Sequence, residues 1–86
     1  MELTLNIPEY DLNKGIKYNW KEGFCIDVKY KNGAVILKAN REGLMSLANH
    51  FLNLAQDAIP VGYHIHFDQF NSLENGSVEI IIEKVQ

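Results

Sequence analysis

Apolar and polar residues alternate on both sides of an Asn-Gly pair at positions 32–33. Asn-Gly between alternating segments is the strongest short-range hairpin signal, because both residues tolerate the positive φ angles of a type I′ turn. The pattern therefore predicts two antiparallel strands, over residues 24–30 and 34–39. A two-residue loop also fixes the register, which pairs Ile26 with Ala39, Asp27 with Lys38, Val28 with Leu37, Tyr30 with Val35 and Lys31 with Ala34.

The hydrophobic period lengthens to that of an α-helix after Asn40, whose side chain suits an N-cap. We expect a helix over residues 41–57, since Pro60 forces the residue before it out of helical dihedral angles. Its predicted apolar stripe consists of Leu44, Leu47, Ala48, Phe51, Leu54, Ala55 and Ala58. Its predicted polar side consists of Asn49, Asn53, Gln56 and Asp57.

Three further alternating segments, residues 2–7, 63–70 and 77–84, each predict a β-strand. Residues 8–22 form an irregular connection with room for a short strand at 16–19. The element order is thus ββ(β)αββ, and one helix can cover only one face of an antiparallel sheet. We predict an α+β fold in which a four- to five-stranded antiparallel sheet has one helix packed on one face.

The length of 86 residues suits one domain with one modest core, so residues 1–86 are expected to form a single domain. The predicted core consists of Leu3, Leu5, Ile26, Val28, Val35, Leu37, Leu44, Leu47, Phe51, Leu54, Ile65, Phe67, Val78, Ile80 and Ile82.

The segment YHIHF, residues 63–67, places its two histidines on the side of the sheet opposite the core. His64 and His66 share this open side with Asp68, and two histidines at this spacing can bind a metal ion if a third ligand is present. His50 is on the predicted helix, hence on the core side, so the three histidines are not expected to converge. We therefore expect solvated histidines in a binding face and no metal site.

Signals for catalysis are weak. Cys25 could pair with His64 or His66 as a nucleophile, but nothing near it in the sequence indicates a lowered thiol pKa. The chain contains no P-loop, GxGxxG, GxSxG or HExxH motif. We expect a protein that is not an enzyme, with no catalytic residue and no cofactor.

Charge is unevenly distributed within the net value of −3. Residues 1–43 contain seven basic and six acidic side chains, whereas residues 44–86 contain only Lys84 against five acids. This argues against nucleic-acid binding, which needs a basic surface, and suits a basic protein partner. No apolar stretch approaches a membrane span of about 18 residues, and a lone cysteine without a signal peptide indicates a cytoplasmic protein.

The open side of the predicted sheet mixes apolar, imidazole and acidic side chains, which suits contact with a protein better than capture of a small molecule. Aromatic residues of the 8–22 connection could anchor such a contact or, equally, cover the core. The residues expected to bind a partner are His64, His66, Asp68, Glu74, Glu79, Trp20 and Tyr10.

Three segments of the second half carry a family resemblance: NREGLMSLANH at 40–50, GYHIHFD at 62–68 and NSLENGS at 71–77, before an isoleucine-rich strand. Together they resemble the immunity protein 32 family of bacterial polymorphic toxin systems. The resemblance implies a small α+β protein that binds and neutralises a cognate secreted toxin in the producing cell, without chemistry of its own.

Two other interpretations remain open from the sequence. The strand with His64, His66 and Asp68 could belong to a small metal- or ligand-binding regulatory domain. The chain could also be a homo-oligomeric structural domain, for example a homodimer formed through the open face of its sheet.

Overall fold

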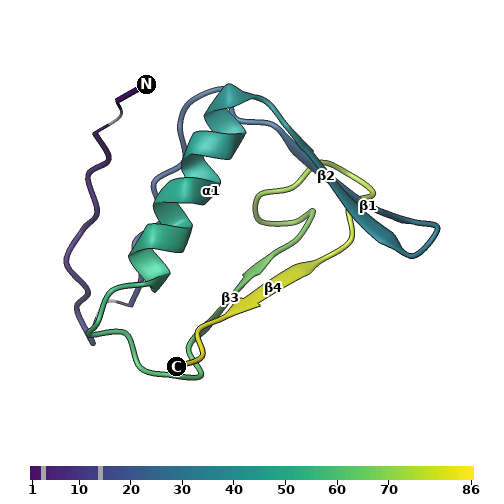
Figure 1. The fold of residues 1–86 in the computed structure, drawn as a ribbon. Helices are drawn as coiled ribbons and strands as arrows, with labels where there is room; N and C mark the ends of the chain where they lie inside the picture. The colour runs from purple at the N-terminus through teal and green to yellow at the C-terminus, as the bar shows by residue number, and fades with distance from the viewer. Residues whose placement is uncertain (3, 14) are drawn as a thin grey trace.

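A computed structural model describes residues 1–2, 4–13 and 15–86, which contain one helix and four strands. The strands are β1 (Ile26–Lys31), β2 (Ala34–Ala39), β3 (His64–Phe67) and β4 (Ile80–Glu83), and the helix is α1 (Arg41–Leu54). Figure 1 shows α1 between the N-terminal segment on one side and the two pairs of strands on the other. The α+β class is confirmed.

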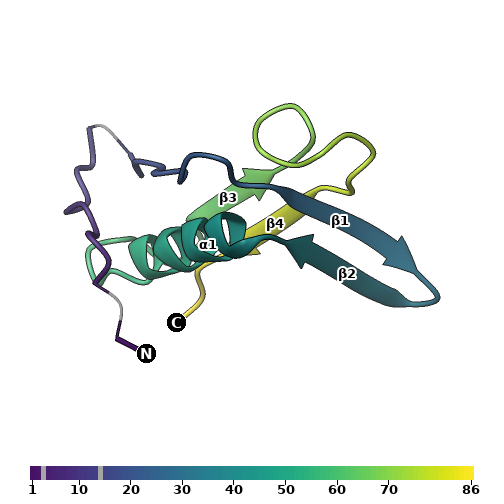
Figure 2. The same ribbon diagram turned by 90° about the horizontal axis from the view of Figure 1, so that it is seen from above.

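The hairpin of β1 and β2 has the predicted register, with Ile26 opposite Ala39 and Lys31 opposite Ala34. At the turn, Asn32 and Gly33 have φ angles of 52° and 78°, as the Asn-Gly signal requires. Figure 2 shows this hairpin extending well past the start of the helix.

The single four- to five-stranded sheet was a wrong prediction, because the strands form two separate two-stranded antiparallel sheets, β1–β2 and β3–β4. The reason lies in residues 74–78, which include the start of the predicted last strand at residue 77. Glu74 N donates to Ile26 O at 2.9 Å and Val78 N donates to Val28 O at 2.9 Å, so this segment borders β1. Pairing with β3 begins only at Ile80. The chain therefore passes from the side of one hairpin into the other.

The N-terminal strands are also absent from the part of the chain that the structure describes. Residues 4–7 and 16–19 have no strand, and Leu3 lies outside the described residues. In Figure 1 the start of the N-terminal segment lies on the far side of α1 from the strands. Residues 16–19 reach β3 through side chains, since Tyr18 packs on Phe67 with ring centroids 6.2 Å apart.

The helix begins as predicted, with the Asn40 side chain accepting a hydrogen bond from Gly43 N at 2.8 Å. It ends at Leu54, three residues before the predicted end, with Ala55 as its C-cap. The buried face differs from the predicted stripe, because Ser46, Asn49, His50 and Asn53 are buried together with Leu47 and Leu54. Leu44 and Phe51 are instead 54% and 44% exposed.

The burial of polar helix residues follows from the segment that packs on them. Within the described residues this segment makes no backbone hydrogen bond to a strand, and several of its backbone groups find partners on side chains of the helix and of the residues just after it. Asn53 Nδ2 donates to Lys17 O at 2.9 Å, and Lys21 N donates to Ser46 Oγ at 2.9 Å. Gln56 Nε2 donates to Pro8 O at 2.9 Å. Side chains of the helix and of Gln56, just after it, thus take the place of a strand partner.

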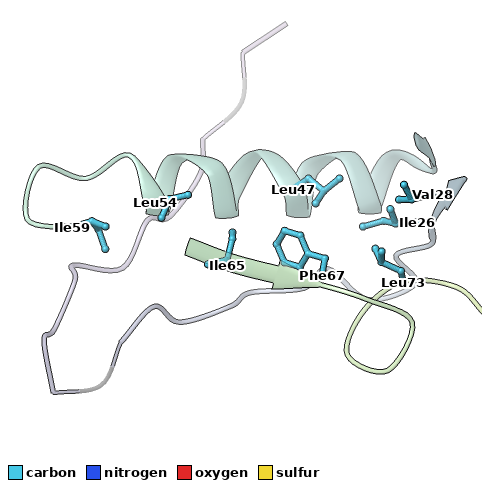
Figure 3. Packing of buried hydrophobic residues seen from close by; sticks show 8 residues of the cluster. All are labelled: Ile26, Val28, Leu47, Leu54, Ile59, Ile65, Phe67 and Leu73. Atoms are coloured by element: carbon cyan, nitrogen blue, oxygen red, sulfur yellow. The ribbon is translucent and has the colours of Figure 1, made fainter. Parts of the chain in front are cut away.

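The buried apolar core lies between α1 and the strands (Figure 3). Six predicted members are buried: Ile26, Val28, Leu47, Leu54, Ile65 and Phe67. Ile59 and Leu73 complete the core and were not predicted. Leu5, Ile80 and Ile82 are partly buried. Five predicted members are exposed by more than a third: Val35, Leu37, Leu44, Phe51 and Val78.

Candidate functional site

The histidine strand has the predicted alternation. In β3, Ile65 and Phe67 are 2% and 1% exposed, while His64 and His66 point into solvent. The two imidazole rings lie edge to face with centroids 5.0 Å apart. They define one row of the surface called here the open face, the side of the β3–β4 sheet turned away from α1.

The second row of the open face comes from β4 and the residue before it, where exposed side chains alternate with partly buried ones. The second row consists of Glu79, Ile81 and Glu83. His66 Nδ1 lies 3.1 Å from Glu79 Oε2, and β4 places Ile81 opposite His66 and Glu83 opposite His64. Ile81 is 55% exposed. The face therefore presents imidazoles and carboxylates around one exposed apolar side chain.

Two further predicted contact residues, Asp68 and Glu74, have carboxylates that already accept hydrogen bonds within the chain. Asp68 Oδ1 accepts hydrogen bonds from Phe70 N at 2.9 Å and Asn71 N at 3.1 Å, and so it shapes the loop that follows β3. Glu74 Oε1 accepts a hydrogen bond from Cys25 Sγ at 3.2 Å. Asp68 directly follows β3, whereas Glu74 lies beside the start of β1, where its backbone N–H donates to Ile26 O.

The hydrogen bond between Cys25 and Glu74 also affects whether Cys25 can act as a nucleophile. The hydrogen bond from Cys25 to Glu74, with smaller contributions from burial and from nearby carboxylates, raises the pKa of the Cys25 thiol. A raised pKa leaves less thiolate at neutral pH, and thiolate is the reactive form. Cys25 thus donates its hydrogen bond to a carboxylate, and the pairing with His64 or His66 that the sequence allowed is not formed.

The third histidine lies where the sequence placed it, on the core side. His50 is 0% exposed and is surrounded by aromatic rings, with Trp20 at 4.4 Å, Tyr18 at 5.1 Å and Phe67 at 5.9 Å between centroids. Desolvation lowers its pKa to about 4. Within the described residues, no three His, Cys, Asp or Glu side chains gather closely enough to hold a metal ion.

The two aromatic residues expected to anchor a partner are both partly buried against the core. Trp20 stacks on Phe24 with centroids 4.5 Å apart, and Tyr10 lies edge to face with Tyr63 at 6.0 Å. Their main contacts are therefore intramolecular.

Trp20 also borders the open face. A pocket of about 230 Å³ lies at the edge of β3 and is lined by Tyr18, Trp20, His66, Phe67 and Asn71. Tyr18 and Asn71 were not among the predicted site residues. The alternation of Tyr18 with Trp20 was the available signal for the first, and Asn71 gave none, since its position depends on the loop after β3.

The fold is that of a small α+β protein with one helix packed over antiparallel strands and an exposed acidic, histidine-bearing face. Residues 34–85 match the family of immunity protein 32, and the chain belongs to this family. The resemblance of residues 40–84 is thereby confirmed. No match was found among curated proteins or among solved structures.

Membership of the family implies that the chain neutralises a cognate toxin, and immunity proteins are typically inhibitors without enzymatic activity. The described part of the chain has no helix of the length and apolarity needed to cross a membrane.

Proposed function

We propose that the chain neutralises its toxin by direct contact through the open face, in the cytoplasm of the producing cell. The observation that carries the proposal is the exposed double row formed by β3 and β4. Its imidazole and carboxylate groups are solvent-accessible and surround the exposed Ile81. An apolar centre within a polar rim is the usual composition of a protein-binding surface.

The toxin surface that fits this face is basic. Residues 57–83 contain five acids, Asp57, Asp68, Glu74, Glu79 and Glu83, and no lysine or arginine. Complementary charge increases the association rate and disfavours wrong partners. His64, His66 and Glu79 form the centre of the proposed contact, and Asp68 and Glu74 contribute negative charge outside this centre.

The aromatic residues contribute less directly in this proposal. Trp20 reaches the contact through the pocket that it lines next to His66. Tyr10 acts indirectly, because it packs on Tyr63, the residue before β3.

Charge reversal at Glu79 tests the open face. The partner is the product of the neighbouring gene, which should kill cells only when this chain is absent. We expect Glu79→Lys to weaken binding at least about tenfold, a change of about 1.4 kcal/mol, mainly through a slower association. Glu22→Lys makes the same charge change at an exposed residue outside the open face and should bind normally. Equal binding by both variants would refute the proposed surface.

Metal analysis tests the regulatory-domain interpretation of His64 and His66. The toxin-binding proposal involves no metal, so the purified protein should contain no stoichiometric zinc or nickel. Stoichiometric metal that disappears in His64→Ala would contradict it.

A further inference from the structure

The outer edge of β2 has backbone groups without strand partners among the described residues. Asn40 N donates to Cys25 O at 3.1 Å, so these two residues form a hydrogen-bonded pair at the end of the β1–β2 hairpin. Hydrogen-bonded and non-hydrogen-bonded pairs alternate along an antiparallel pair of strands. Hydrogen-bonded pairs therefore fall at Asp27–Lys38 and every second pair beyond, and the N–H and C=O groups of Val35, Leu37 and Ala39 point outward.

The equivalent groups on the other side of the hairpin follow the same alternation, and three of them have partners. Ile26 O and Val28 O accept the hydrogen bonds from residues 74 and 78, and Val28 N donates to Ser77 Oγ at 3.1 Å. One edge of the hairpin is thus covered by the chain itself, whereas the β2 edge is open.

The open edge is also apolar. Val35 is 64% exposed, Ile36 38% and Leu37 39%, and Lys38 is the only charged residue of the strand. Natural proteins usually protect an edge strand with charges, proline or a bulge, because an unprotected edge pairs with another strand. Residues 34–37 contain none of these features.

Two exposed side chains of β2 lie on the same side of the hairpin as its buried residues. Leu37 lies opposite Val28, which belongs to the core, and Val35 follows the same alternation. We call the outer edge of β2, residues 34–39, the edge surface.

We infer that the edge surface pairs with the edge surface of a second copy of the chain. Antiparallel pairing about a two-fold axis at Leu37 brings Val35 opposite Ala39 of the second copy. These residues have the outward backbone groups, so the same three residues supply donors and acceptors on both sides. A closed dimer requires such self-complementarity.

Charge favours this register over its neighbour. Pairing centred on Leu37 places Lys38 opposite Ile36 of the second copy, whereas a shift of one residue toward the helix would place the two Lys38 residues opposite each other. Like charges directly opposite are destabilising. The side chains of Val35 and Leu37 from both copies lie on the same side of the joined sheet, where they lose their exposure to water.

This dimer uses a different surface from the open face. The proposed toxin contact lies on the β3–β4 sheet, and the edge surface lies on the outer edge of β2 in the other sheet. Self-association therefore leaves the open face free, and its test does not depend on a toxin.

Light scattering and sedimentation of the purified chain over a concentration series test the inference. We expect a species of twice 9.8 kDa that dissociates on dilution. Val35→Pro removes an outward N–H without removing a hydrogen bond to β1, and Leu37→Lys places a charge at the two-fold axis. Each should weaken dimerisation at least about tenfold. Ile81→Lys, the same type of change on the open face, should leave the dimer intact.

Circular dichroism establishes that each variant is folded, and Val35→Lys, at a more exposed position, replaces Leu37→Lys if that variant unfolds. A chain that is monomeric at every concentration would overturn the inference. A dimer that Ile81→Lys dissociates and Val35→Pro does not would also overturn it, because the interface would then be the open face. Loss of toxin binding in Val35→Pro, with no wild-type dimer, would assign the edge to the toxin instead.

Discussion

Protonation of His50 should destabilise the fold in mild acid. This imidazole is 0% exposed, and neither ring nitrogen has a hydrogen-bond partner among the described residues. The rings of Tyr18, Trp20 and Phe67 surround it, so the environment offers no charge to balance an imidazolium. Desolvation accordingly lowers the pKa of His50 from 6.5 to about 4.

The sign of the effect follows from linkage. Between pH 6.5 and about 4 the unfolded chain binds a proton at His50 that the folded chain does not. The unfolding free energy therefore falls as the pH falls, by about 1.4 kcal/mol per pH unit and by up to about 3 kcal/mol in all. Above pH 6.5 this contribution is constant.

Urea unfolding at several pH values measures this slope, with Trp20 fluorescence as a reporter beside His50. Carboxylates also titrate near the acid end, so the decisive quantity is the difference between the wild type and His50→Phe. Phenylalanine cannot bind a proton and leaves no buried nitrogen unpaired, so this variant should match or exceed wild-type stability at pH 7. His64→Gln controls for the loss of an imidazole. Equal slopes for wild type and His50→Phe between pH 5 and 6.5 would refute the reasoning.

Three other substitutions probe close contacts. Gly43→Ala should destabilise the fold by about 1–3 kcal/mol, because the added Cβ would lie 2.8 Å from the backbone oxygen of Cys25. This would outweigh the higher helix propensity of alanine, and an unchanged urea midpoint would contradict it. Asn53→Ala should cost about 1–3 kcal/mol by leaving Lys17 O without its donor, as thermal unfolding would show. Glu74→Gln should speed alkylation of Cys25 at pH 8, since Glu74 raises the thiol pKa; a slower rate would exclude that cause.

The hairpin could be predicted from sequence because its determinants are local. Asn32 and Gly33 fix the turn, and the alternation on either side fixes which residues face each other. The alternation of β3 likewise gave the correct exposure of His64 and His66. Each of these features depends on residues within a few positions of one another.

The buried face of the helix could not be predicted in this way. Periodicity places Leu44 and Phe51 in the core if the helix covers a complete sheet. The structure instead buries Ser46, Asn49 and Asn53 beneath an N-terminal segment that lacks a strand partner. Whether such a segment forms a strand is a long-range property, and it decides which helix face needs polar side chains.

The candidate site was predictable to the same extent. His64, His66 and Glu79 come together because β3 and β4 pair as the alternation required. The hydrogen bonds of Asp68 and Glu74 depend on loop conformations that no periodic pattern encodes.

The errors about α1 and β2 have a common physical meaning. A chain of 86 residues buries a limited apolar area, and here Leu44, Phe51, Val35 and Leu37 remain exposed while four polar helix residues are buried. Single exposed apolar residues such as Leu44 and Phe51 need no explanation, but Val35 and Leu37 lie on an open strand edge, which pairs readily with another strand. The alternation that misplaced Val35 and Leu37 in the core of one chain is satisfied if they are buried between two chains.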